Sequence, residues 1–158
     1  NAKQIQRGNK PERDPGDENR RTPPMIVVDT NIICLRWLPA AETSQADALL
    51  KRDPDWGTAI LWRWEFRNAL AGYVRRGSLT GNAATTICSR AEAAMSEREF
   101  WAQPADIFPL VSHSSCTAYD CEFVAVARDH GVRLITADRE VLREFPHIAV
   151  SLADFLSS

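Results

Sequence analysis

The sequence predicts an α/β domain with three layers, α/β/α, around a central, mostly parallel sheet of four to five strands. Two observations lead to this prediction. From Met25 onward, short apolar runs rich in Val and Ile alternate with longer segments of helical period, as in sheets whose strands are joined by helical crossovers. The first run, MIVVD (25–29), has no polar alternation, which is expected of a strand covered on both faces.

Five apolar runs are predicted as strands, and the segments between them as helices. The strands are expected at 25–29, 57–60, 106–111, 132–136 and 147–151. The helices are expected at 30–37, 42–52, 61–77, 80–98, 114–131, 138–145 and 152–158. Pro109 interrupts the third apolar run, so we expect that strand to lie at an edge or to be broken.

Turn and capping residues mark the ends of several helices. Asp53-Pro54 stops the second helix, because the residue before a proline avoids the helical conformation. Gly77 and Gly131 lie just past the third and fifth helices, where glycine readily adopts the left-handed conformation. Thr80 can cap the fourth helix at its amino end.

Composition predicts one globular domain preceded by a polar tail. The 158 residues are 44% hydrophobic and 25% charged, which is typical of globular proteins. Residues 1–24 are rich in Pro, Gly and charge and have no periodicity, so we expect a flexible tail followed by a domain at 25–158. No apolar run approaches the roughly 20 residues that span a bilayer, and residues 1–24 contain no apolar stretch. We therefore expect a cytoplasmic protein with no membrane partner.

The charge of the domain argues against nucleic-acid binding by charge alone, and the spacing of its cysteines argues against a zinc site. Residues 25–158 hold 13 basic and 17 acidic residues, whereas a domain that holds nucleic acid by charge alone would be basic. A role with nucleic acid would therefore need a local site or a partner. The four cysteines lack CxxC spacing and none pairs with a histidine at metal-ligand spacing, so we expect buried free thiols and no zinc site.

Four acids occupy positions where an isolated carboxylate is costly. Asp29 directly follows the first strand and Asp138 closely follows the fourth, at the strand ends beyond which such sheets bind ligands. Glu65 and Asp120 lie on the apolar faces of their helices. Removing an unpaired carboxylate from water costs several kcal/mol. A shared divalent cation explains the four together, and oxygen ligands without Cys or His suit Mg²⁺ or Mn²⁺.

Each acid also has a simpler explanation. Asp29 and Asp138 can each cap the helix that follows, and Asp120 stands three residues after Thr117, as in an approximate capping box. Glu65 can pair with a nearby arginine, the candidates being Arg63, Arg67 and Arg90.

Four segments resemble, in order, the successive motifs of the PIN domain family, and most of all its VapC-like bacterial toxins. They are MIVVDTNII, WRWEFRNAL, AYDCEFVAVARDHG and LITADREV. The match runs from Met25 to about Phe155; VDTN alone is a weak signal, whereas YDxxFVAVAxxxG followed by LITAD is specific. Cys121 and Glu122 depart from the small or apolar residues common at their positions, and Glu122 either faces the surface or adds charge near the site.

The resemblance implies a metal-dependent endoribonuclease that is the toxin of a toxin–antitoxin pair. It implies Mg²⁺ or Mn²⁺ as cofactor and RNA cleavage that leaves 5′-phosphate and 3′-hydroxyl ends. The implied partners are RNA, a cognate antitoxin protein and a second copy of the chain in a homodimer. The implied catalytic and metal-binding residues are Asp29, Glu65, Asp120 and Asp138, with Asn31 and Thr136 in support. Asp29 and Asp138 are expected to bind the ion directly, and Glu65 and Asp120 to hold its water or a second ion.

Arginines and tryptophans on the helices are further candidates for contact with partners. Arg36 and Arg67 are expected to line the rim of the crevice and contact RNA, together with Arg63, Arg75 and Arg76, although a solvated face explains them equally well. Trp62 and Trp64 are two residues apart, so both cannot face one core. Whichever of Trp37, Trp62 and Trp64 is exposed would mark part of an antitoxin surface or would have no role.

Two other classes of protein remain as alternatives. One is a non-catalytic PIN-like module that binds RNA or protein, which does not explain why four acids are clustered. The other is a phosphatase or phosphotransferase that uses the first aspartate as its nucleophile. That class requires a second acid two residues later, and Asn31 occupies this position.

Overall fold

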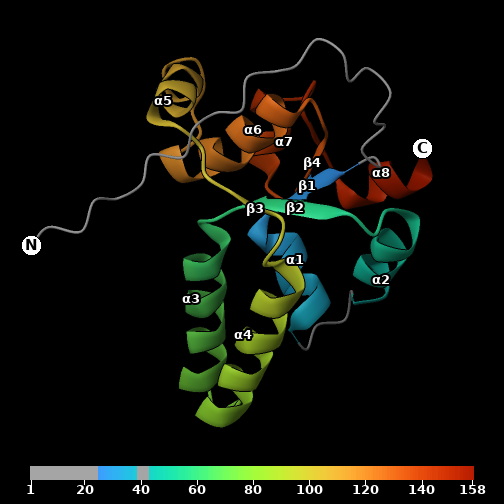
Figure 1. The fold of residues 1–158 in the computed structure, drawn as a ribbon, viewed down its shortest axis with the longest axis vertical. Helices are drawn as coiled ribbons and strands as arrows, with labels where there is room; N and C mark the ends of the chain where they lie inside the picture. Colours follow the sequence, from blue (N-terminus) through green and yellow to red (C-terminus); the bar gives the residue numbers. More distant parts are fainter. Residues whose placement is uncertain (1–24, 39–42) are drawn as a thin grey trace, which may run out of the picture.

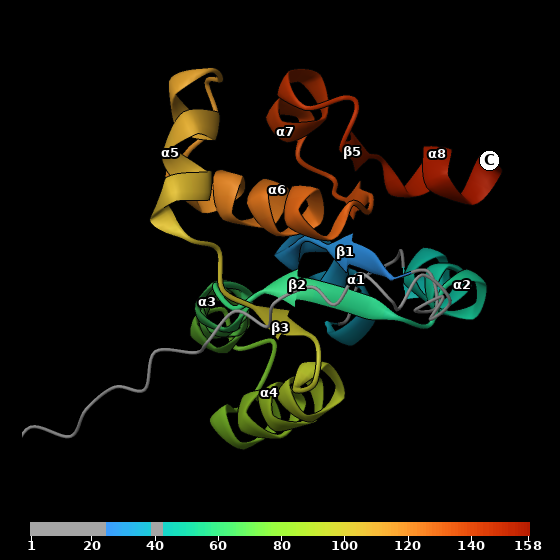
Figure 2. The ribbon, with the colours of Figure 1, turned by 45° about the horizontal axis from the view of Figure 1, so that its top comes forward.

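The computed structural model describes residues 25–38 and 43–158 (Figure 1). The tail predicted at 1–24 lies outside these residues. The predicted three-layer α/β/α fold is confirmed: five parallel strands form one sheet in the order β3-β2-β1-β4-β5. Figure 2 shows α5, α6 and α7 on one side of the sheet and α1, α3 and α4 on the other. The strands are β1 (Ile26–Val28), β2 (Trp56–Ala59), β3 (Glu99–Phe100), β4 (Leu134–Ile135) and β5 (Ala149–Val150).

The helices agree with the predicted order except around residue 106. They are α1 (Thr30–Trp37), α2 (Thr43–Arg52), α3 (Trp62–Arg75), α4 (Gly81–Met95), α5 (Pro104–Ser112), α6 (Ala118–His130), α7 (Arg139–Glu144) and α8 (Leu152–Ser157). Thr80 caps α4 by accepting a hydrogen bond from the Ala83 amide at 3.2 Å. Gly77 and Gly131 have φ angles of 73° and 66°, so the predicted turns at both glycines are confirmed.

The strand predicted at 106–111 is wrong, because this segment lies within α5. Pro104 occupies the start of the helix, where proline is favoured, and Ile107, Leu110 and Val111 follow a helical spacing that packs against the core. Pro109 lies inside the helix despite the hydrogen bond that it cannot donate. The third strand is instead β3, and α4 ends at Met95 rather than at residue 98.

The register of the central strands determines where the site lies. Ile26, Val27 and Val28 are all buried, and Val28 pairs with Ile135 of β4. The residues that follow these two strands therefore emerge side by side at the carboxyl edge of the sheet. The Asp29 amide donates a hydrogen bond to the Ile135 carbonyl at 3.0 Å, which continues the pairing by one residue.

The structure also bears on the cysteines and on the length of the apolar helices. The four cysteines are free, and Cys116 and Cys121 are buried whereas Cys34 and Cys88 are half-buried. Within the described part of the chain, no helix combines the length and apolar character needed to cross a membrane.

Candidate active site

Asp29 is held at the end of β1 by two polar side chains. Its Oδ2 atom accepts hydrogen bonds from the Thr136 hydroxyl at 2.5 Å and from the Asn31 amide at 2.8 Å. Thr136 is fully buried and comes from the neighbouring strand end after β4. Asp29 occupies the amino-terminal cap position of α1, but its side chain makes no capping hydrogen bond. The hydrogen bonds that hold the Asp29 carboxylate thus come from Asn31 and Thr136 rather than from a helix cap, and the part of these two residues in catalysis stays a prediction.

Asp138 is connected to Asp29 through the same threonine. The Asp138 amide donates to the Thr136 hydroxyl oxygen at 3.0 Å, and that hydroxyl donates to Asp29. The Asp138 Oδ1 atom also accepts from the amides of Glu140 and Val141, at 2.7 and 3.0 Å. Asp138 therefore caps α7 as its simpler explanation proposed, but the cap uses only one carboxylate oxygen.

Glu65 faces the end of β1 from the first turn of α3. Its Oε2 atom accepts a short hydrogen bond from the hydroxyl of Thr30, a buried residue that directly follows Asp29. Two of the arginines proposed as partners of Glu65 pair with other acids, Arg63 with Glu92 and Glu99 and Arg67 with Glu92. Within residues 25–38 and 43–158, Arg90 forms no salt bridge with Glu65. Thr30 is a site residue that the sequence analysis missed, although its place between Asp29 and Asn31 in VDTN was a signal.

Asp120 lies in the first turn of α6 and makes the capping box that its spacing predicted. Its Oδ2 atom accepts from the Thr117 amide at 2.9 Å and from the Thr117 hydroxyl at 2.7 Å. The Asp120 amide donates back to the Thr117 hydroxyl at 3.2 Å. The Oδ1 atom of Asp120 takes no part in this box.

The ionisation of Glu65 depends on its burial and on the charges of three other acids. Burial is the main cause that raises the pKa of Glu65, and the hydrogen bond from Thr30 opposes it. The negative charges of Asp29, Asp120 and Glu122 raise this pKa further. Of the two positions proposed for Glu122, the structure therefore supports the one near the site. Burial likewise raises the pKa of Asp29, against the hydrogen bonds that it accepts.

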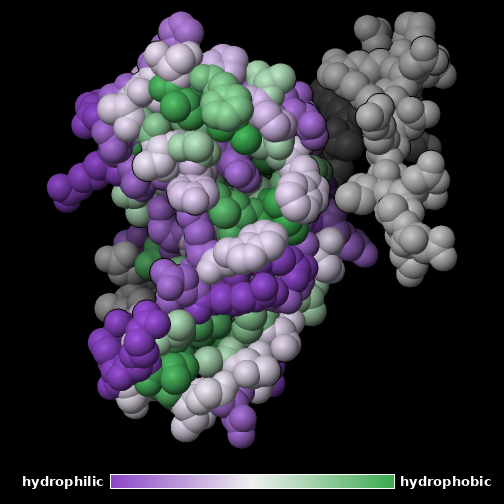
Figure 3. Space-filling model, turned by 90° about the vertical axis from the view of Figure 1, so that its left-hand side faces the viewer, coloured by the Kyte–Doolittle hydropathy of each residue, from purple (hydrophilic) through white to green (hydrophobic). Residues whose placement is uncertain are grey.

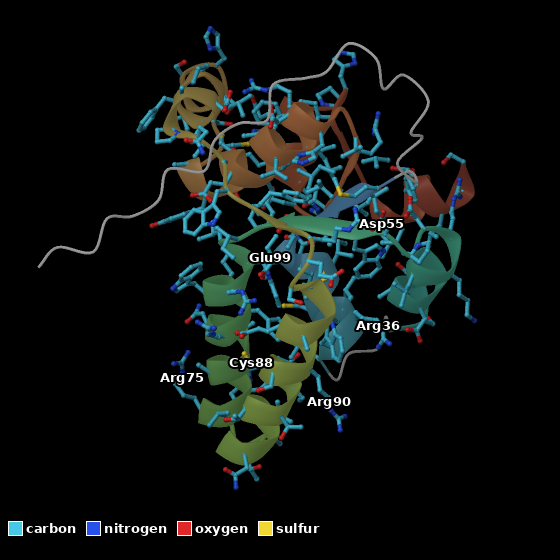
Figure 4. All side chains as sticks on the ribbon, in the orientation of Figure 1. Arg36, Asp55, Arg75, Cys88, Arg90 and Glu99 are labelled. Carbon is cyan, nitrogen blue, oxygen red and sulfur yellow. The ribbon has the colours of Figure 1, made fainter. Side chains whose placement is uncertain are left out.

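The two arginines predicted to contact RNA are both engaged in ion pairs. Arg67 pairs with Glu92 at 2.5 Å, between α3 and α4. Arg36 pairs with Asp47 at 3.3 Å and lines a cavity of about 560 Å³ together with Asp55. Figure 4 shows Arg36 at the lower end of α1, on the side of Asp55, which precedes β2. The position of Arg36 toward the amino ends of the strands favours a structural ion pair over a role at the rim.

The donor set fits a hydrated divalent cation. Within residues 25–38 and 43–158, none of the four acids has an arginine or lysine in salt-bridge contact. In the same ranges no three His, Cys, Asp or Glu side chains are grouped closely enough to enclose an ion. Mg²⁺ needs only one or two protein carboxylates because it keeps several waters. The negative charges of Asp29 and Asp120 raise the pKa of Glu65, and a cation bound beside these carboxylates would offset this repulsion.

Comparison with known proteins agrees with this architecture. Ribonuclease VapC3 of Pyrobaculum aerophilum is 27% identical over 124 residues, which are 77% of this chain and 95% of the relative. The crystal structure of PAE2754 from the same organism superposes with a TM-score of 0.67 at 20% identity, over 85% of this chain and 88% of that one. A toxin–antitoxin complex from Klebsiella pneumoniae gives a TM-score of 0.58 at 17% identity, over 80% of this chain and 97% of the other. The sequence pattern of the PIN domain matches residues 26–148. The chain belongs to the PIN domain family.

Proposed function

We propose that this protein is a Mg²⁺- or Mn²⁺-dependent ribonuclease that hydrolyses RNA phosphodiester bonds as the toxin of a toxin–antitoxin pair. The observation that supports this most is the group of acids around Glu65. Asp29, Asp120 and Glu122 raise the pKa of Glu65, and none of these four acids forms a salt bridge with an arginine or lysine of residues 25–38 and 43–158. The similarity to a protein named Ribonuclease VapC3 points to RNA as the substrate. We place its action in the cytoplasm, where RNA substrates are found.

Each acid has a distinct part in the proposed reaction. Asp29 and Asp138 would hold the ion, and Glu65 and Asp120 would hold water around it. The bound ion would lower the pKa of a water molecule and neutralise charge that develops on the phosphate. In-line attack of water then leaves a 5′-phosphate and a 3′-hydroxyl.

The polar neighbours of the acids fix their orientation. Thr136 and Asn31 donate to the same oxygen of Asp29, which directs its other oxygen away from this network. Thr30 does the same for Glu65, and Thr117 for Asp120. Such supporting hydrogen bonds commonly contribute tenfold to a hundredfold to metal affinity or activity.

We further propose an antitoxin protein and a second copy of the chain as partners. A groove of about 580 Å³ between α3 and α4 is lined by Leu70, Ala71, Val74 and Ala84 together with polar residues. In Figure 3, apolar residues form part of the surface in the lower half of the view, where α3 and α4 lie. This groove is our candidate for the antitoxin, because an apolar surface with a polar rim suits a protein partner. The Klebsiella pneumoniae structure is itself described as a toxin–antitoxin complex.

The proposed function is tested by incubating the purified protein with total RNA in Mg²⁺, in Mn²⁺ and in EDTA, and then mapping the ends. Discrete fragments with 5′-phosphates are expected in either metal and none in EDTA. Equal cleavage in EDTA would exclude metal-dependent hydrolysis. RNA that is bound but left intact in both metals would favour the non-catalytic module.

A further inference from the structure

Two exposed aromatic side chains lie directly beside two of the candidate catalytic acids. Trp64 precedes Glu65 on α3, and Tyr119 precedes Asp120 on α6. Trp64 is 53% exposed and Tyr119 is 63% exposed. By contrast, Trp62 is fully buried, so α3 turns one tryptophan into the core and the other to the surface.

The two aromatics line one groove although they come from segments more than 50 residues apart. The groove has a volume of about 410 Å³ and is lined by Leu61, Trp64, Glu65, Asn68 and Tyr119. This volume is within the range of roughly 300–1,000 Å³ that is usual for small-ligand sites. Glu65 belongs both to the groove and to the acid cluster, so a molecule in the groove would extend to the site of the reaction.

We propose that this groove binds an unpaired nucleobase of the RNA substrate, next to the phosphate that is cleaved. The inference rests on the proposed ribonuclease function and adds a binding subsite to it. Trp64 and Tyr119 are exposed aromatic side chains in this groove, and bases of any kind stack on such rings. The amide of Asn68 has both donors and an acceptor for a base edge. The substrate class is therefore single-stranded RNA or the loop of a folded RNA, whose bases are free to leave the stack.

The chemistry of the groove favours a base over the apolar face of a protein helix. An apolar segment would cover the amide of Asn68 and the carboxylate of Glu65 without hydrogen-bonding them, and that costs free energy. A nucleobase offers polar edges to Asn68 and a flat face to the aromatics. The attached phosphate would then lie toward Glu65, where the positive charge of the ion would offset the negative charges of the acids.

The test compares steady-state cleavage of a short single-stranded RNA by Trp64→Ala, Tyr119→Ala and the wild type in Mg²⁺. Each variant is expected to raise KM about tenfold, because stacking on an aromatic is lost, and to change kcat less than about threefold. Trp64→Phe and Tyr119→Phe keep an aromatic face and are expected to restore KM. Trp101→Ala is the matched control, since Trp101 is 72% exposed and lines a different cavity.

Several results would overturn the subsite. One is an unchanged KM in both alanine variants; another is an equal rise in KM for Trp101→Ala. A third is loss of dimerisation of Trp64→Ala in light scattering with KM unchanged, which would assign the groove to a second copy of the chain. Failure of the ribonuclease proposal is distinguishable, because in that case the wild type itself would not cleave RNA.

Discussion

Replacement of Asp138 by Asn is expected to reduce RNA cleavage at least about a hundredfold while the protein stays folded. Asp138 caps α7 through Oδ1, which accepts from two backbone amides. Asparagine caps helices as well as aspartate does, so the substitution removes the charge that binds the ion and keeps the cap. Loss of a residue that only supports a metal ligand costs tenfold to a hundredfold, and loss of a ligand is expected to cost at least the upper value. Initial cleavage rates at limiting Mg²⁺, with circular dichroism as a check on folding, measure the effect.

Two control variants separate charge from structure in this experiment. Asp138→Ala removes both charge and cap, so it is expected to lose the same activity and also about 1 kcal/mol of stability. Asp106→Asn removes an exposed acid that pairs with Arg128 on α6, and its activity is expected to equal that of the wild type. Wild-type rates in Asp138→Asn would remove Asp138 from the catalytic site.

Mg²⁺ is expected to raise the melting temperature of the protein by several degrees, and more at pH 8 than at pH 5. Burial raises the pKa values of Asp29 and Glu65 above their ordinary values of 3.8 and 4.5. The folded state therefore binds more protons than the unfolded state between the ordinary and the raised values. By linkage, the metal-free protein loses stability as the pH rises through this window. An ion that binds the carboxylates offsets this loss, and at 100 times its Kd it contributes about 2.7 kcal/mol.

Asp29→Asn provides the matched variant for this measurement. It removes one of the charges that raise the pKa of Glu65, so it is expected to melt at a higher temperature than the wild type in EDTA. It is also expected to lose most of the response to Mg²⁺. Differential scanning fluorimetry in EDTA and in Mg²⁺ at both pH values measures both effects. A lower melting temperature than the wild type in EDTA would mean that the hydrogen bonds accepted by Asp29 outweigh its repulsion.

The fold was predictable where an apolar run marks a buried strand or helix. The buried residues of β1 have no polar alternation, and the turn at Gly131 ends a helix with a continuous apolar face. The third strand was misplaced because no apolar run marks β3: its two residues are Glu99 and Phe100, and both are half-buried. β4 and β5 are equally short, but each contains two apolar residues. The position of β3 depends on hydrogen bonds to β2, such as that from the Thr58 amide to the Arg98 carbonyl at 3.0 Å. No local pattern reports such a contact.

The site was predictable to the extent that strand ends determine it. Asp29 and Asp138 could be placed together because parallel strands end at one edge, and the pairing of β1 with β4 agrees with that expectation. The hydrogen bond from Thr30 to Glu65 and the groove between Trp64 and Tyr119 depend on how α3 and α6 pack. Sequence spacing does not give the packing of two distant helices, so these features needed the structure.

We propose that Asp29, Glu65, Asp120 and Asp138 together form one metal site. The most direct measurement is the anomalous difference map of crystals grown in Mn²⁺. We expect a peak in direct contact with the carboxylates of Asp29 and Asp138 and linked to Glu65 and Asp120 directly or through water. A peak that touches none of the four acids, or carboxyl groups more than about 10 Å apart and so beyond a shared hydrated ion, would contradict the claim.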